Sequence, residues 1–253
     1  YLYLTEAYNA FGLNGNDYGI LETGDGRSNK IVAMRRFHNE LLVYQEELGV
    51  EGGTLTLFEG YSPTTFGKLV LSTKLGTMNN NSVAIIDGVL TSTRTEEKVK
   101  TLAFALSRYG IYACDGLNLF MISDDIQNYF DPTKDECIRR GYESKMWLAH
   151  DTAKNVLRIG LVSGDSATEP NVFPVFDLVD KVWSFDTPAQ ELSCMIEVEG
   201  DGDVAIIQIG GGIDDGFVYQ LNYGTNDVST LVDSYLQLEF NAGGEYMLLR
   251  ELM

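Results

Sequence analysis

Proline, histidine and cysteine are scarce in this chain of 253 residues, which has 5 prolines, 2 histidines and 3 cysteines. The cysteines (Cys114, Cys137 and Cys194) are far apart and form no Cys-x-x-Cys pair, so the sequence predicts neither a disulfide framework nor a zinc site. With so few prolines, the turns must depend on Gly, Asn and Asp, as tight β-hairpins do. No apolar run is long enough for a membrane-spanning helix, and we expect no membrane partner.

Basic residues are also few: 18 Lys and Arg stand against 37 Asp and Glu, for a formal net charge of −19. The Lys and Arg residues are scattered along the chain and form no basic stripe. A surface this acidic repels phosphate backbones, so the composition excludes DNA or RNA binding by counterion release.

The sequence has few candidates for catalytic residues. His38 falls in an expected hairpin turn and His150 at a strand end, with no Gly-x-Ser-x-Gly sequence to accompany them. Asp124-Asp125 fits the first turn of a short helical segment better than an acid–base pair. The run Gly210-Gly211-Gly212 precedes an expected strand and not a helix, which argues against a phosphate loop. We therefore predict that the protein is not an enzyme and has no cofactor.

Several acidic residues lie next to glycine in expected turns. Asp201 and Asp203 are weak candidates for calcium ligands, because they cluster oxygens in a glycine-flanked loop but lack the spacing of a calcium-binding loop. We interpret the remaining pairs as structural hairpin turns, since Asp-Gly between apolar runs is a strong hairpin signal. These pairs are Asp87-Gly88, Asp115-Gly116 and Asp215-Gly216.

The dominant positive signal is a series of short apolar runs joined by turns of a few residues, the pattern of antiparallel strands. The runs gather into four packets followed by a tail. The packets span residues 30–72, 82–122, 145–186 and 192–222, with 231–253 and 1–8 as closing or exit strands. Ser123 to Phe130 reads as one or two helical turns with Ser123 at the cap.

Packets of strands that recur about every 40–55 residues are typical of propeller blades. We therefore predict an all-β fold, a β-propeller of four-stranded antiparallel blades forming a single domain over residues 1–253. A β-sandwich with many hairpins is the alternative. No long helix is expected, so architectures built from βαβ units are excluded.

The order of several motifs resembles the β-propeller proteins of tailed-phage virions, the tail hub, nozzle or adaptor of short-tailed phages. The resemblance covers about residues 23–240. It rests on DGRSNKIVAMRRFHNELLVYQ from Asp25 to Gln45, RYGIYACDGLNLFMISDDIQNYF at 108–130, FPVFDLVDKVWSFD at 173–186, DDGFVYQLNYGTND at 214–227 and DSYLQLEF at 233–240.

This resemblance implies a structural role in a virion, with the protein made in the host cytoplasm. It implies a ring of copies of the chain, a hexamer by analogy with the family, in contact with neighbouring tail, portal or adaptor proteins. DNA would pass through the ring without specific binding. Four packets are fewer than the six or more blades of a full ring, so we expect the propeller to be incomplete in this chain and part of a longer protein.

Two other function classes stay open. A carbohydrate- or receptor-binding propeller would show exposed aromatic side chains clustered at one end of the blades. A propeller glycosidase would place two carboxylates within about 5–10 Å of each other.

Overall fold

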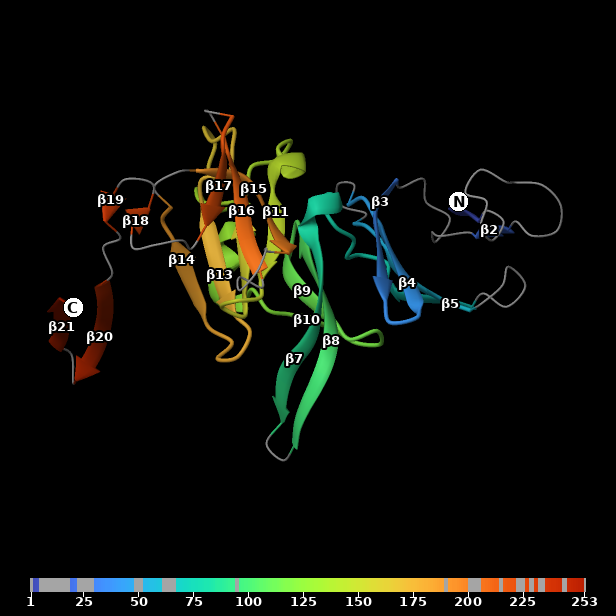
Figure 1. Ribbon diagram of the computed structural model, residues 1–253, viewed down its shortest axis with the longest axis horizontal. Coiled ribbons are helices and arrows are strands. Elements are labelled where there is room, and N and C mark those ends of the chain that lie inside the picture. Colours follow the sequence, from blue (N-terminus) through green and yellow to red (C-terminus); the bar gives the residue numbers. More distant parts are fainter. Residues whose placement is uncertain are drawn as a thin grey trace.

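The computed structural model describes residues 2–4, 19–21, 30–47, 52–60, 67–93, 96–188, 191–199, 206–213, 216–221, 226–227, 230–231, 235–242 and 245–252. Over these residues the protein is all-β. Three antiparallel sheets of four strands and one of three strands follow one another along the chain (Figure 1). Each of the four sheets falls within one of the packets expected from the sequence.

The first sheet has the order β3-β4-β5-β6. The sheet is a simple up-and-down meander, in which each strand pairs with its neighbour in sequence. Positive φ at His38, in the two-residue turn between β3 and β4, is the backbone conformation that such a tight turn requires. The strands are β3 (Ile31–Phe37), β4 (Glu40–Gln45), β5 (Leu55–Glu59) and β6 (Gly67–Ser72).

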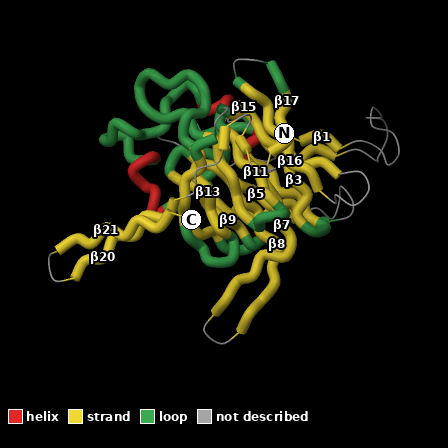
Figure 2. Tube along the Cα trace, turned by 60° about the vertical axis from the view of Figure 1, so that its left-hand side comes forward, coloured by secondary structure: helices red, strands yellow, loops and turns green. Residues whose placement is uncertain are grey.

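The second sheet contains the longest strands, β7 and β8, whose far ends pair only with each other and project from the sheet as a two-stranded arm (Figures 1 and 2). This arm includes a polar stretch, Thr91–Thr93 on β7 and Glu96–Lys98 on β8. The strands are β7 (Val83–Thr93), β8 (Glu96–Ser107), β9 (Gly110–Cys114) and β10 (Leu119–Met121).

The third and fourth sheets repeat this meander. In the third sheet the order is β11-β12-β13-β14, and in the fourth it is β15-β16-β17. The strands are β11 (Trp147–Asp151), β12 (Val156–Gly160), β13 (Phe173–Asp177), β14 (Trp183–Asp186), β15 (Leu192–Glu199), β16 (Ile206–Gly212) and β17 (Val218–Leu221).

The segments 1–8 and 231–253, expected as closing or exit strands, contain strands that pair with near neighbours in the chain. Near the N-terminus, β1 (Leu2–Leu4) pairs with β2 (Gly19–Leu21), and near the C-terminus β20 (Tyr235–Ala242) pairs with β21 (Glu245–Leu252). The two-residue strands β18 (Asn226–Asp227) and β19 (Thr230–Leu231) also pair with each other. The N- and C-termini lie at opposite ends of the long axis (Figure 1), so the structure does not pair the first strands with the last.

Helical structure in the described part of the chain is limited to three short 3₁₀ segments. They are η2 (Asn80–Ser82), η3 (Asp124–Tyr129) and η4 (Glu143–Lys145). The helical turn expected after Ser123 is present as η3, but Ser123 makes no side-chain cap. Its hydroxyl instead accepts a hydrogen bond from the backbone N–H of Ile111 at 3.0 Å, which ties the start of η3 to strand β9.

The sheets stack face to face in chain order. The first strand of each sheet contacts the first strand of the next, because β3 contacts β7, β7 contacts β11 and β11 contacts β15. One apolar cluster lies at each of the three junctions between successive sheets. The outermost strands β6, β10 and β14 have exposed and half-buried residues only, whereas the second strands β4 and β12 are mostly buried.

Candidate functional site

Within the ranges that the structure describes, no three His, Cys, Asp or Glu side chains lie close enough to hold a metal ion. His38 is exposed at the tip of the β3–β4 hairpin, and the adjacent pair Asp124-Asp125 is exposed on η3. None of the described helices is long and apolar enough to span a membrane. The features that stand out are the three junctions between sheets and one uncovered sheet face.

The junction between the first and second sheets encloses a carboxylate. Glu47 is 1% exposed, and its two oxygens accept backbone N–H groups from different segments. Its Oε1 accepts from Gly76 at 3.0 Å and its Oε2 from Arg108 at 2.7 Å. Burial raises the pKa of this carboxyl above its usual value, and the hydrogen bonds from Arg108, Ser107 and Gly76 oppose that shift. Glu47 thus connects the end of the first sheet to the β8–β9 turn of the second.

Two tyrosines in the same junction differ in how their hydroxyl groups are satisfied. Tyr112 of β9 donates to the carbonyl of Gly76, whereas the hydroxyl of Tyr44 on β4 is buried and has no hydrogen-bond partner among the described residues. Burial raises the pKa of both phenols. Both rings pack in one apolar cluster with the buried thiol of Cys114. This junction therefore mixes apolar packing with buried polar groups.

The junction between the second and third sheets is apolar at its centre and polar at its edges. Its core brings together side chains such as Phe104, Leu157 and Ile159, all buried. At one edge, the amide of Asn79 donates to the carbonyls of Glu143 and Met146, at 2.6 and 2.8 Å.

At the outer edge of the same junction, an indole hydrogen bond links the third sheet to the second. Trp183, on the outermost strand of the third sheet, donates its Nε1–H to the carbonyl of Ile122 at 2.8 Å. Ile122 directly follows β10 of the second sheet. Hydrogen bonds therefore join the second and third sheets at two places. Asn79 bonds the segment that leads into β11, and Trp183 of β14 bonds the residue that follows β10.

The junction between the third and fourth sheets is centred on Trp147. Its indole lies over Gly160, where a Cβ would approach the ring nitrogen to 2.3 Å, so only glycine fits on the paired strand. The indole N–H donates to the carbonyl of Leu192 on β15 at 3.2 Å. Nearby, the Thr152 hydroxyl donates to Glu197 at 2.6 Å, and the Thr152 backbone N–H also donates to Glu197. Three hydrogen bonds thus fix the fourth sheet to the third.

The second histidine belongs to this junction. His150, on β11, has its Nδ1 3.2 Å from the Thr152 hydroxyl, while its Nε2 is buried with no partner among the described residues. Thr152 in turn bonds Glu197 at 2.6 Å. The three side chains link the third sheet to the fourth.

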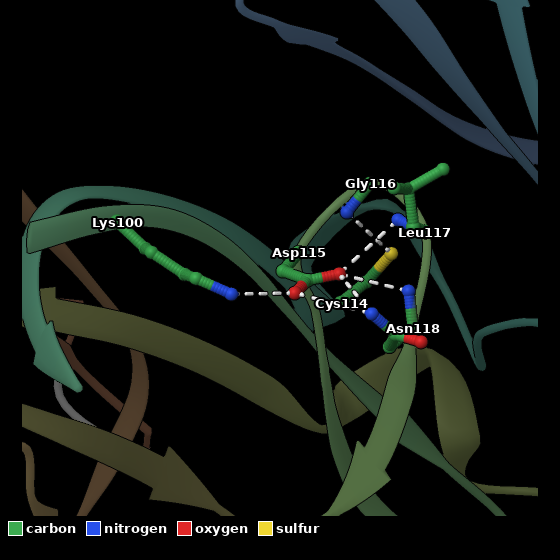
Figure 3. A network of polar contacts seen from close by, with 6 residues as sticks. All are labelled: Lys100, Cys114, Asp115, Gly116, Leu117 and Asn118. Atoms are coloured by element: carbon green, nitrogen blue, oxygen red, sulfur yellow. Dashed lines mark hydrogen bonds and ion pairs between the residues drawn. The ribbon is translucent and has the colours of Figure 1, made fainter. Parts of the chain in front are cut away.

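Asp115-Gly116 lies in the connection between β9 and β10, where the sequence predicted a turn (Figure 3). The connection has four residues and not two, because Cys114 pairs with Leu119. The Asp115 Oδ1 accepts the backbone N–H groups of Leu117 and Asn118, at 3.2 and 2.8 Å, and Oδ2 accepts from Lys100 at 2.8 Å. Burial would raise the pKa of this carboxyl, but the hydrogen bonds from Lys100, Asn118 and Leu117 prevail and lower it to about 2.

The pair Asp87-Gly88 does not form the predicted hairpin turn. It lies inside strand β7 at a bulge, where two residues of β7 stand opposite the single residue Thr101 of β8. The Thr101 hydroxyl donates to Asp87 at 2.7 Å. Gly88 has a φ of +81°, a backbone conformation that glycine adopts without strain and other residues adopt only at an energetic cost. The bulge marks the point where the β7–β8 arm leaves the sheet.

The remaining predicted positions are only partly within the described chain. Gly216 precedes β17 with a φ of +71°. Asp215 and both calcium candidates, Asp201 and Asp203, lie outside the described residues. The run Gly210-Gly211-Gly212 forms the end of strand β16, and the next described element is strand β17, not a helix.

The fourth sheet has one face against the third sheet and one face uncovered. Met195 and Leu221 point into the junction. The opposite face, here called the open face, consists of Cys194, Ile196, Val198, Ile209, Gly211, Val218 and Gln220, which the strand register places in adjacent rows. Ile196 is 61% exposed and Val218 71% exposed, and no member of the open face is charged.

The sequence analysis did not find the contacts between sheets or the open face. Asn79, Trp147 and Trp183 act through backbone carbonyls that lie at least 45 residues away along the chain. The only local signal was the tryptophan itself, since a buried indole N–H needs an acceptor.

Comparisons with known proteins leave the family open. No protein-family model and no curated protein matches the chain. Among solved structures, the chain is similar to the computationally designed Ika4 protein, at 14% identity and a TM-score of 0.36, over 81% of this chain and 99% of that chain. A likeness at this level assigns neither a fold family nor a function.

Proposed function

We propose that this chain is part of a β-propeller that serves as a structural component of a phage tail, in a ring of copies around the DNA-ejection channel. The observation that carries the proposal is the order of stacking. Successive sheets pack face to face, and the first strand of each contacts the first strand of the next, as blades do around a propeller axis.

The junctions between sheets support a scaffold role. Each combines an apolar cluster with hydrogen bonds that cross from one sheet to the next, such as Trp147 to Leu192 and Asn79 to Met146. Such a body resists bending between its sheets, because packed interiors transmit strain and deform little. A conduit for DNA under internal pressure needs this rigidity and needs no catalysis.

The charge of the chain supports the same role. A formal charge of −19 keeps DNA from adhering to the protein, because the phosphates meet charge of the same sign. A conduit lined by such subunits would let DNA pass without binding it. A strongly basic surface turned toward the channel of the assembled ring would contradict this part of the proposal.

Native mass spectrometry and negative-stain electron microscopy of the purified protein test the proposal. We expect a homo-oligomer of fixed stoichiometry with a central opening, and no retention on a DNA column at physiological salt. A glycan array on the same sample tests the alternative of a carbohydrate-binding propeller. A protein that stays monomeric and binds glycans would overturn the proposal.

A further inference from the structure

The fourth sheet has one strand fewer than the other three sheets. The first three sheets each end in a fourth, outermost strand, whereas the fourth sheet ends at β17 among the strands that the structure describes. The described strands that follow β17 do not fill the vacant position, because β18 pairs with β19 and β20 pairs with β21. At the start of the chain, β1 pairs with β2. Within the described part of the chain, the outer edge of β17 is therefore the edge of an incomplete sheet.

The ladder between β16 and β17 shows which backbone groups lie on that outer edge. The Phe217 carbonyl accepts the backbone N–H of Gly212 at 2.9 Å, and Tyr219, two residues further on, also lies opposite β16. Inter-strand hydrogen bonds alternate in direction along an antiparallel strand, so every second residue bonds to the same neighbour. The N–H and C=O groups of Val218 and Gln220 consequently point away from β16. Both residues are exposed, Val218 at 71%.

The edge of β17 lacks the features that protect the other outermost strands. Natural sheets protect exposed edges with charged residues, with proline or by keeping the edge strand very short. Strand β6 carries Lys68, β14 ends in Asp186, and β10 has only three residues. Strand β17, together with Phe217, contains no charged residue and no proline. An unprotected edge of this kind is a template for pairing with another strand.

We propose that β17 pairs antiparallel with β17 of a second copy of the chain, across a twofold axis at Tyr219. In this register Val218 lies opposite Gln220 of the second copy on each side of the axis, and about four backbone hydrogen bonds join the two chains. Other registers pair fewer of the outward-facing groups of β17. The two fourth sheets then form one continuous sheet, in which each copy supplies the outermost strand that the other lacks.

A second copy is the occupant that this edge favours. Backbone pairing requires another exposed edge in extended conformation, and each copy of the chain brings one. A contact between identical surfaces is isologous, and twofold dimers of this kind are the commonest homo-oligomers. Copies with a formal charge of −19 repel one another, so they can approach most closely where charge is absent, as it is along β17.

The pairing goes beyond the proposed ring and does not depend on it. An isologous contact closes on two copies, whereas a ring needs contacts between two different surfaces of the chain. If the ring forms, the β17 contact joins two rings; without the ring, it joins two chains. In both cases the loss of the contact halves the mass of the assembly, so the failure of the ring and the failure of the pairing are distinguishable.

Substitutions on the outer edge of the full chain test the pairing by native mass spectrometry and analytical ultracentrifugation. Gln220→Pro removes an outward N–H and leaves the hydrogen bonds to β16, a place where edge strands tolerate proline. Val218→Glu places a carboxylate on the edge. Because each substitution occurs twice in a twofold contact, we expect the dissociation constant of the pair to rise by about tenfold or more.

Val179→Glu is the matched control. It adds the same charge at a residue that is similarly exposed, at 54%, but lies in the β13–β14 connection. This variant should pair like the wild type, and unchanged far-ultraviolet circular dichroism shows that the edge variants are folded. A wild type that never pairs, or folded edge variants that pair as tightly as the wild type, would overturn the proposal.

Disulfide cross-linking in a glutathione redox buffer tests the register. All variants carry Cys194→Ser, because the thiol of Cys194 is exposed. Tyr219 and its symmetry copy form a non-hydrogen-bonded pair with Cα atoms about 4.5 Å apart, so Tyr219→Cys is expected to form a covalent dimer. Gln220 and its copy are diagonal neighbours about 7–8 Å apart, so Gln220→Cys should not cross-link. Covalent dimers of Gln220→Cys, or none of Tyr219→Cys, would overturn the contact at Tyr219.

Discussion

The first and second junctions between sheets hold the molecule together by different means. Between the second and third sheets, the contact is a continuous apolar cluster that includes Leu157 and Ile159. Between the first and second sheets, apolar side chains surround the polar groups of Glu47, Tyr44 and Tyr112. Apolar packing tolerates small shifts, whereas a buried polar group stabilises only when its partners are in place. The stability of the first junction therefore depends more strongly on the positions of its side chains than that of the second.

Truncation in the apolar junction should have the largest effect. Leu157→Ala removes a fully buried side chain of β12 and is expected to lower the free energy of unfolding by about 2–5 kcal/mol. Urea denaturation followed by far-ultraviolet circular dichroism measures this loss. Val182→Ala, at a residue 56% exposed in the β13–β14 connection, serves as the control and should change stability by less than about 0.5 kcal/mol. Equal losses in both variants would show that the junction is not the packed core.

Removal of the buried carboxylate should cost nearly as much. Glu47→Ala leaves the N–H groups of Gly76 and Arg108 without their acceptor, which is expected to lower stability by about 2–4 kcal/mol. Glu47→Gln separates the charge from the hydrogen bonds. Because burial raises the folded pKa of Glu47, the wild type gains stability from this group below the usual value of 4.5 and loses it as pH rises through the folded pKa.

The stability difference between Glu47→Gln and the wild type should therefore shift in favour of the variant from pH 4 toward pH 8. Urea titrations at several pH values measure this difference. A difference that stays constant over that range would show that Glu47 is not desolvated as the structure has it.

Replacement of Tyr44 and of Tyr112 by phenylalanine should change the free energy of unfolding in opposite directions. Tyr44→Phe removes a buried hydroxyl that has no partner among the described residues, and is expected to raise stability by about 1 kcal/mol or more. Tyr112→Phe leaves the Gly76 carbonyl without its donor and should lower stability by about 1 kcal/mol. Thermal unfolding of both variants side by side provides the measurement. Two changes of the same sign would contradict the arrangement of this junction.

The smallest effect is expected at the surface loop of Asp115. Its lowered pKa means that the ionised carboxylate stabilises the fold above pH 3.8, and that this contribution is lost as pH falls toward about 2. Asp115→Asn should therefore lower stability by about 1 kcal/mol at pH 7, because Lys100 is partly exposed and the ion pair is screened. Near pH 2 the variant and the wild type should unfold at the same urea concentration.

The two described Asp-Gly pairs show what local sequence can and cannot predict in this protein. Asp115-Gly116 lies in a loop between two strands, while Asp87-Gly88 lies at a bulge within one strand. The dipeptide supplies a backbone that can take positive φ in either place. Whether the chain then reverses depends on the residues beyond it. Here the polar residues Thr91–Thr93 and Glu96–Lys98 continue the strands, because β7 and β8 stay paired beyond the bulge.

The candidate site was less predictable than the fold. The sequence analysis named turn residues, because turns have local signals, and five of its six turn positions lie in the loop or the bulge just described or next to β17. It did not name Glu47, Asn79 or Trp147, whose partners lie far along the chain. Asp201, Asp203 and Asp215 lie outside the described residues, so the calcium prediction remains a prediction.

The sequence by itself determined that this chain forms antiparallel meanders, and roughly where each begins and ends. Alternating apolar residues, scarce prolines and glycine-rich turns specify local strand pairing, because each strand pairs with its neighbour in the chain. Only the tertiary structure decided which faces meet, which buried polar groups find partners, and that the fourth sheet keeps an apolar face uncovered. Those outcomes depend on contacts between residues distant in the chain, and no local pattern records them.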